Sequence, residues 1–194
     1  MLNFTRSLAI FLLTALCLSP VTVASSEPLL LKATKRGGYG LVHKDFRIGL
    51  RPRTHQQIAA FYEARGLPKT AIKELEKVCF FTLGMHNTSK DVLWLDLNNW
   101  QFFSNGEPVK RLDKAYWKAT LQQMGVSRPL QATFRWTQMP TTLDFRDDER
   151  EGGNIILPRD KSPYTVTATL IAQADKSGKQ YHLRVDNMAC ADEN

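Results

Sequence analysis

Apolar and polar residues alternate along much of the chain from residue 79 onward. In residues 79–86 and again in 92–97 every second side chain is apolar, which is the period of a β-strand with one buried face. The clearest pair is 164–174 and 179–187, where a DKSG turn joins two alternating segments and predicts an antiparallel hairpin. Shorter strands are predicted at 46–51, 100–104, 131–138 and 154–157.

Two other segments have the period of an α-helix. Residues 54–78 predict a helical hairpin, because Thr54 and Gln57 have the spacing of a capping box and a Gly-Leu-Pro sequence separates two apolar stripes. A further helix is predicted at 113–124, where an Asp precedes another apolar stripe. This helix interrupts the part of the chain that is otherwise rich in strands.

The order of these elements predicts a mainly β fold. We expect an antiparallel immunoglobulin-like β-sandwich over 79–194, with one inserted helix, and we expect the hairpin at 54–78 to pack with it as one domain. A basic N-terminal arm with a short strand is expected at 25–53. The alternating strand, Asn-rich turn and Leu-rich strand over 79–97 resemble immunoglobulin-like domains of exported bacterial proteins. That resemblance is architectural, covers roughly 79–190 and implies no particular activity.

The first residues have the features of a secretory signal peptide. Arg6 provides a positive charge, an apolar run of about a dozen residues follows, and small residues before position 25 fit cleavage after Ala24. This run is too short to cross a bilayer, so residues 1–24 predict a periplasmic or secreted protein that is not transmembrane. Cys17 raises the alternative of a lipoprotein, but Leu16 stands where a lipobox needs a small residue.

Two cysteines remain after removal of the signal peptide. An even number of cysteines in an exported chain is typical of disulfides, so Cys79 and Cys190 are predicted to form one. The bond would connect the first strand of the predicted sandwich to the C-terminal end of the chain.

Positive charge is concentrated near the N-terminus. The chain has a net charge of +7, and residues 25–53 contain seven Lys and Arg against two acidic residues. We interpret Arg47, Arg51 and Arg53 as candidate contacts to an acidic partner surface or to acidic phospholipid headgroups. The favoured interpretation of the charge is nevertheless a solvated segment that only improves solubility, and nucleic acid is not an expected partner outside the cytoplasm.

Histidine and methionine provide weak candidates for a copper site. The residues are His43, Met85, His86, His182 and Met188. In an extended strand Met85 and His86 point to opposite faces, and no pair of ligands has a recognised metal-binding spacing. We therefore interpret the segment around Met85 as core and turn, with no bound cofactor, and copper binding remains an alternative.

Candidates for catalysis are equally sparse. The chain contains no GxSxG sequence, and a cysteine in a disulfide is no nucleophile. Carboxylates crowd together in residues 144–151, which could serve a hydrolase or calcium. The spacing is not that of a calcium loop and two arginines lie within it, so a solvated loop is the favoured interpretation.

Trp94 is the remaining candidate for binding. Alternation places it on the face opposite Leu93 and Leu95, which would otherwise meet solvent. Either the helical hairpin covers Trp94 or it belongs to a binding surface.

Together these patterns favour an exported, non-catalytic binding or accessory module that docks on an envelope protein or complex. A periplasmic copper-handling protein and a carboxylate-dependent hydrolase are the alternatives, in that order.

Overall fold

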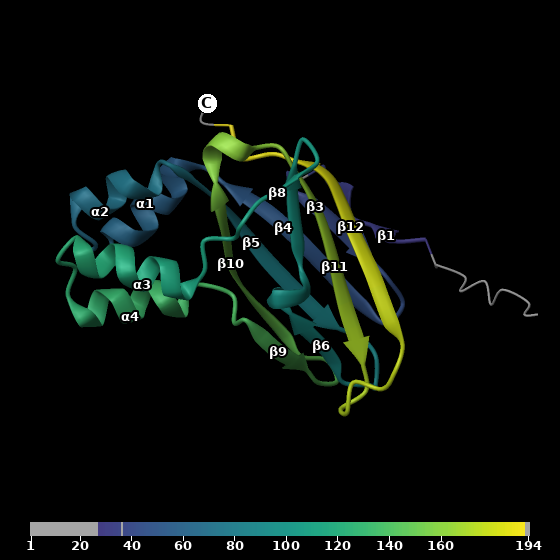
Figure 1. Ribbon diagram of the computed structural model, residues 1–194. Helices are drawn as coiled ribbons and strands as arrows, with labels where there is room; N and C mark the ends of the chain where they lie inside the picture. The colour runs from purple at the N-terminus through teal and green to yellow at the C-terminus, as the bar shows by residue number, and fades with distance from the viewer. Residues whose placement is uncertain (1–26, 36, 193–194) are drawn as a thin grey trace, which may run out of the picture.

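Two β-sheets pack face to face, and four helices lie together at one end of them (Figure 1). The computed structural model describes residues 27–35 and 37–192. Within them the predicted mainly β fold is confirmed. The predicted signal peptide at 1–24 and Cys17 lie outside the described residues.

The first sheet has five strands in the order β10-β5-β4-β3-β2, and all of its pairings are antiparallel. The strands are β2 (Lys32–Ala33), β3 (Tyr39–Val42), β4 (Phe46–Arg53), β5 (Val78–Asn87) and β10 (Arg150–Pro158). The segment expected to be a basic arm therefore supplies the middle strand of this sheet. The reason is the alternation in β4, which buries Phe46, Ile48 and Leu50 while its arginines face outward.

The second sheet has seven strands, with β1-β12-β11-β6-β9 in order, β7 also paired to β11, and β8 paired to β7. Here β1 runs parallel to β12, which departs from the antiparallel prediction, while the other pairings in this sheet are antiparallel. The predicted hairpin is confirmed as β11 and β12. The strands are β1 (Leu29–Leu30), β6 (Leu93–Asp96), β7 (Gln101–Ser104), β8 (Glu107–Pro108), β9 (Thr142–Phe145), β11 (Tyr164–Ala172) and β12 (Gln180–Met188).

The inner faces of the two sheets form the larger hydrophobic core. Alternate residues of β4, β5 and β10 meet alternate residues of β6, β11 and β12 there, and each is almost fully buried. Burial of this apolar area is the main stabilising contribution to such a sandwich. The core includes Phe46, Ile48, Leu50, Phe81, Leu83, Met85, Leu93, Leu95, Ile155, Val166, Leu170, Leu183 and Val185.

The helices form a second core with one end of the five-stranded sheet. Phe80 of β5 and Ile156 of β10 point out of the sandwich and are buried among helix side chains such as Tyr62, Trp117 and Phe134. The elements are α1 (His55–Glu63), α2 (Lys69–Leu75), α3 (Lys114–Gln123) and α4 (Arg128–Trp136), with single 3₁₀ turns at Leu97–Asn99 and Arg159–Lys161. The predicted capping box at Thr54 and Gln57 is present at the start of α1.

The strand predicted at 131–138 is wrong, because residues 131–136 belong to α4, and two helices rather than one are inserted between strands. Alternating apolar residues here resemble a strand over a short window. Pro129 in the first turn favours the helix. Phe134 is buried against Tyr62 and Trp117, whereas Trp136, two positions later, is 82% exposed, as expected on opposite sides of a helix.

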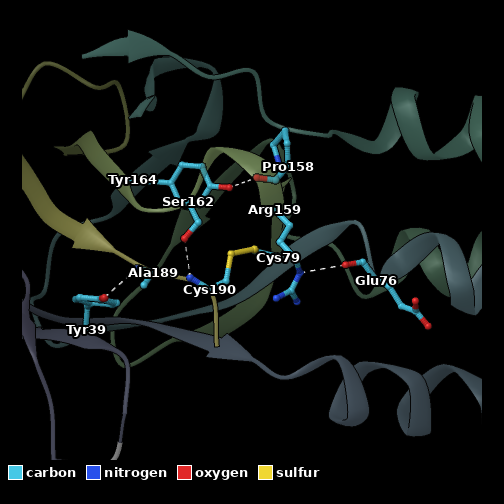
Figure 2. The surroundings of a disulfide bond; sticks show 9 residues. All are labelled: Tyr39, Glu76, Cys79, Pro158, Arg159, Ser162, Tyr164, Ala189 and Cys190. Atoms are coloured by element: carbon cyan, nitrogen blue, oxygen red, sulfur yellow. Dashed lines mark hydrogen bonds between the residues drawn. A yellow bond between two sulfur atoms is a disulfide. The ribbon is translucent and has the colours of Figure 1, made fainter. Parts of the chain in front are cut away.

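The predicted disulfide between Cys79 and Cys190 is confirmed (Figure 2). Cys79 belongs to β5 and Cys190 follows β12, so the bond joins the two sheets. The segment around Cys190 is further held by its backbone N–H, which donates to Ser162 Oγ at 3.1 Å. The neighbouring N–H of Ala189 donates to the Tyr39 hydroxyl at 3.0 Å.

Candidate functional site

Four glycines form a row across the outer face of the five-stranded sheet. Gly40 pairs with Gly49, Gly49 with Gly84, and Gly84 with Gly152, so one glycine stands at the same level on each of β3, β4, β5 and β10. Gly84 and Gly152 are exposed, whereas Gly40 and Gly49 are half-buried and the methyl group of Thr34 lies close to Gly40. We call this feature the glycine row.

Packing explains some of these glycines but not all. A Cβ on Gly152 would lie 2.6 Å from the carbonyl oxygen of Leu83, so a side chain there is excluded. A Cβ on Gly84 would meet no atom within 4 Å, and the backbone of Gly84 is not in the left-handed region. Glycine inside a strand costs about 0.5–1 kcal/mol relative to Ala. A strand glycine that packing does not require is typical of a place where a ligand or another backbone approaches closely.

Basic side chains border the glycine row on one side. Arg47, His86 and Arg150 occupy the next outward-facing level of β4, β5 and β10, and they pair laterally with one another. The glycine row and this basic border line a hollow of about 590 Å³. Glu151 is the one carboxylate residue among those that line this hollow. It pairs with Met85, so the alternation of β10 assigns it to the face of the sheet opposite the glycine row.

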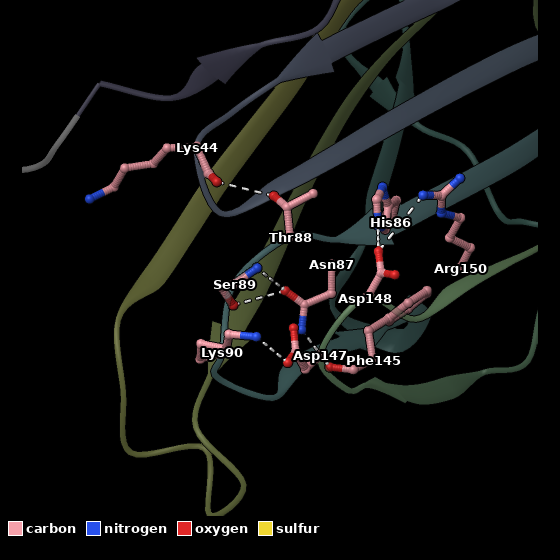
Figure 3. A network of polar contacts seen from close by, with 10 residues as sticks. All are labelled: Lys44, His86, Asn87, Thr88, Ser89, Lys90, Phe145, Asp147, Asp148 and Arg150. Carbon is pink, nitrogen blue, oxygen red and sulfur yellow. Dashed lines mark hydrogen bonds and ion pairs between the residues drawn. The ribbon is translucent and has the colours of Figure 1, made fainter.

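Asp148 holds His86 in place at this border (Figure 3). The two side chains are 2.6 Å apart, and Arg150 Nη2 lies 3.7 Å from the same carboxylate oxygen. The hydrogen bond from His86, followed by the charge of that ring, lowers the pKa of the Asp148 carboxyl. Asp148 has a left-handed backbone with φ of 57°, which places its side chain beside β5.

The turn that follows β5 is built around the buried side chain of Asn87 (Figure 3). Its Nδ2 donates to the carbonyl oxygens of Asp91 and Phe145, and its Oδ1 accepts from both the backbone and the hydroxyl of Ser89. All hydrogen-bonding positions of this amide are therefore occupied, which fixes the rim of the hollow next to His86.

The other side of the glycine row is polar and also basic. Arg53 Nε donates to Thr82 Oγ1 at 2.9 Å, and Thr82 Oγ1 donates to Asn154 Oδ1 at 3.0 Å, so one hydrogen-bonded chain crosses three strands. Burial, with the nearby charge of Arg51, lowers the pKa of Arg53. A second hollow of about 460 Å³ begins here and extends to Phe61 of α1, which is 38% exposed.

The structure brings three of the predicted partner-binding residues together and separates the fourth. Arg47, Arg51 and Arg53 all lie on the outer face of β4, around the glycine row. Trp94 lies on the other sheet, where its Nε1 donates to the carbonyl oxygens of Gln173 and Ala174 in the β11–β12 turn. That turn, and not the predicted helical hairpin, covers Trp94.

The candidate copper ligands are not brought together. Met85 and Met188 are buried in the core between the sheets, while His86 faces outward beside Asp148. His43 stacks on Phe46, and His182 lies next to Thr169 on the seven-stranded sheet. Across residues 27–35 and 37–192 no group of three or more His, Cys, Asp or Glu is arranged to hold a metal ion.

Carboxylates of the 144–151 segment are paired individually with neighbours. Asp147 lies 2.6 Å from Lys90 Nζ, Asp144 lies 3.6 Å from Arg146, and Glu149 accepts the backbone N–H of Arg146 at 2.7 Å. Asp144 lies in β9, while Asp147 and Glu149 belong to the surface turn between β9 and β10.

Sequence reasoning did not find the glycine row itself. Each glycine occupies one outward position of a separate strand, and the four are far apart along the chain. Glycine at outward positions of alternating segments was an available signal, but only the register of β3, β4, β5 and β10 aligns them.

Comparison with known proteins yields distant structural likenesses. No family model and no curated protein matches the chain. Of two Bacillus subtilis structures, YcdA, classed provisionally as a lipoprotein, aligns with a TM-score of 0.41 and 12% identity over 76% of this chain. YjhA aligns with a TM-score of 0.39 and 8% identity, also over 76% of this chain and over 96% of its own. This chain spans about 38% of the length of YcdA. Likeness at this level does not carry a function from one protein to another.

One further feature bears on where the protein acts. The Cys79–Cys190 disulfide is typical of proteins that fold in an oxidising compartment outside the cytoplasm. In the described part of the chain, each helix is too short or too polar to cross a bilayer.

Proposed function

We propose that this protein is an exported, non-catalytic binding module that holds an acidic, extended segment of an envelope protein across the glycine row. The main support for this proposal is the glycine row, and above all Gly84, because packing does not require a glycine at that position. A partner segment in an extended conformation can approach the sheet closely only where the sheet has no side chains. The glycine row leaves room there for the side chains of the partner.

Charge complementarity argues for an acidic occupant. Arg47, Arg51, Arg53 and Arg150 all surround the strip, and in the residues described here the first three form no ion pair. Arginine presents a fork of donors that suits carboxylates. Unpaired arginines around a bare strip favour a partner with Asp and Glu side chains, and they would also speed its association.

Two further observations support the wider proposal. Immunoglobulin-like sandwiches often have a disulfide that joins their two sheets, so the bond between Cys79 and Cys190 supports an immunoglobulin-like fold as part of the proposal. Such sandwiches commonly serve as binding modules, and the same bond supports the proposed site of action in the cell envelope.

Gly84→Val tests the proposal sharply. Valine fits the open space above β5 and favours a strand, so the variant should fold, yet its side chain fills the middle of the strip. The matched control is Thr169→Val, which adds the same side chain at an outward position of the other sheet. We would crosslink each tagged protein to its own cell envelope and identify the captured partner by mass spectrometry.

One dominant partner should be captured by the wild type and by Thr169→Val, and lost by Gly84→Val and by Arg47→Glu/Arg150→Glu. A synthetic peptide of alternating Glu and Ala should compete for capture, and the same peptide with Lys in place of Glu should not. A partner that Gly84→Val captures as well as the wild type would remove the glycine row from the proposal.

A further inference from the structure

A separate pocket lies between α3 and α4, on the helical end of the molecule. The two helices are joined by a short loop and lie side by side (Figure 1). Their facing surfaces enclose a pocket of about 490 Å³. None of the nine residues that line this pocket is acidic, and four are basic: Lys114, Lys118, Arg128 and Arg135.

Helical spacing explains why the four cations face one another. Lys114 and Lys118 are four residues apart on α3, and Arg128 and Arg135 are seven apart on α4, so each pair lies on one side of its helix. Trp117, Leu121 and Phe134, on the adjoining inner parts of the same two helices, are buried in the core beneath the pocket. Folding the helices into a hairpin therefore places two basic stripes across one pocket.

The protein does not neutralise these charges. Among the described residues none of the four takes part in an ion pair. Partial burial, followed by the charges of Arg135 and Arg111, lowers the pKa of the Lys114 ammonium. Like charges held together in this way repel one another until an anion lies between them.

Two buried donors at the same pocket also lack an acceptor. Trp117 is 1% exposed and Gln138 is 4% exposed, and both line the pocket. Their Nε1 and Nε2 atoms have no hydrogen-bond partner among the described residues. A buried donor without an acceptor is costly, and an anion can supply the acceptor directly or through a bridging water.

We infer that the α3–α4 pocket binds a phosphate group. A phosphate monoester carries about two negative charges and three acceptor oxygens, whereas a carboxylate carries one charge and two oxygens. Four cations and two neutral donors match the phosphate better, and arginine binds phosphate with two parallel hydrogen bonds. This inference does not depend on the glycine row, because the glycine row lies on the five-stranded sheet and the pocket lies between two helices.

The phosphate can belong to a soluble compound or to a phospholipid headgroup. Trp136 follows Arg135 directly in the sequence and is 82% exposed, and exposed tryptophans beside cations are frequent at membrane surfaces. The test must therefore include both sources.

Isothermal titration calorimetry at constant ionic strength tests this inference, with inorganic pyrophosphate and citrate as probes. A flotation assay with vesicles of phosphatidylglycerol and phosphatidylcholine provides the lipid arm. The variant is Arg128→Gln/Arg135→Gln, in which both residues are exposed and can be replaced without opening the core. The matched control, Lys69→Gln/Lys73→Gln, removes two positive charges from α2 instead. Far-UV circular dichroism checks that both variants fold.

We expect saturable binding of the phosphate probe that is weaker by about tenfold or more in the α4 variant and unchanged in the α2 control. Vesicle binding that the α4 variant loses, and that Trp136→Ala weakens without affecting pyrophosphate, assigns the phosphate to a lipid. Pyrophosphate binding without vesicle binding assigns it to a soluble compound. Equal binding by wild type and α4 variant, tighter binding of citrate than of pyrophosphate, or no binding of any probe would overturn the inference.

Discussion

The two ends of the outer face of the five-stranded sheet differ in what lies over them. At the helical end of the five-stranded sheet, Phe80 pairs with Ile156, and both side chains are buried under the helices. Four residues further along the same two strands, Gly84 pairs with Gly152 and nothing covers them. Thr82 and Asn154 form the polar level between these two.

This difference shows that the residue types on the outer face of a sheet depend on whether other parts of the chain cover that face. Where the chain covers itself, the strands supply large apolar side chains that stabilise the fold by burial. Where it does not, they supply glycine and arginine, which contribute little to packing but leave room and charge for another molecule. The covered end therefore serves stability, and the open end is the one we propose for binding.

The largest expected effect tests whether the two ends depend on each other. Cys79 lies in β5, which passes through both ends, and its disulfide closes a loop over a sequence separation of 111. Cys79→Ser/Cys190→Ser should lower the free energy of unfolding by about 4–5 kcal/mol, because the unfolded chain is no longer constrained. Urea unfolding with hydrogen exchange measures it. Loss of protection in the helices alone, with the open end unchanged, would show that the ends are independent.

A second pair of changes measures the contrast itself. Phe80→Ala should destabilise the protein by about 3–5 kcal/mol, because it opens a cavity between the sheet and the helices. Gly84→Ala should leave stability unchanged or raise it by about 0.5–1 kcal/mol, since the added methyl meets no atom. Urea unfolding of both variants under identical conditions gives the comparison. Destabilisation by Gly84→Ala comparable to that of Phe80→Ala would mean that packing requires the glycine after all.

The smallest expected effect concerns a polar contact at the covered end. The Tyr62 hydroxyl lies 2.5 Å from Thr137 Oγ1, and burial raises the pKa of Tyr62 to about 12. An unfolded tyrosine ionises near about pH 10, so the neutral hydroxyl stabilises the fold fully below that pH, and this contribution is lost as the pH rises toward about 12. Tyr62→Phe should cost about 1 kcal/mol near neutral pH.

The pH dependence distinguishes this contact from a general loss of packing. The difference in unfolding free energy between wild type and Tyr62→Phe should be constant up to about pH 10 and then shrink as the solution becomes more alkaline. Tyr116→Phe is the control, because Tyr116 is 44% exposed. A difference that stays constant through about pH 12 would contradict the assigned burial of the Tyr62 hydroxyl.

Features set by near neighbours in the chain were predictable. The hairpin of β11 and β12 and the capping box before α1 each depend on residues close together in the sequence. The disulfide was predictable for another reason: only two cysteines remain in the exported chain, so each has one choice of partner. Prediction was wrong at α4, where a few alternating apolar residues fit two periods equally well. The burial of Phe134 among the helices resolves that ambiguity. This burial involves residues far away in the sequence, so the residues next to Phe134 do not reveal it.

The candidate sites depended on longer distances. Arg47, Arg51 and Arg53 were selected from the sequence as charges, but their place in the middle of a sheet follows from pairing with β5, whose strand begins 25 residues after Arg53. Trp94 was selected as an uncovered aromatic, and a turn 79 residues away covers it.

By itself the sequence determined the strand-rich class of the fold, its disulfide and the presence of basic side chains, because periodicity, cysteine count and charge are properties of the chain read residue by residue. The alignment of four glycines and the meeting of two basic stripes were decided by the tertiary structure alone. Both arise from strand register and helix packing, which bring together residues that share no local signal and are selected by burial of the whole core.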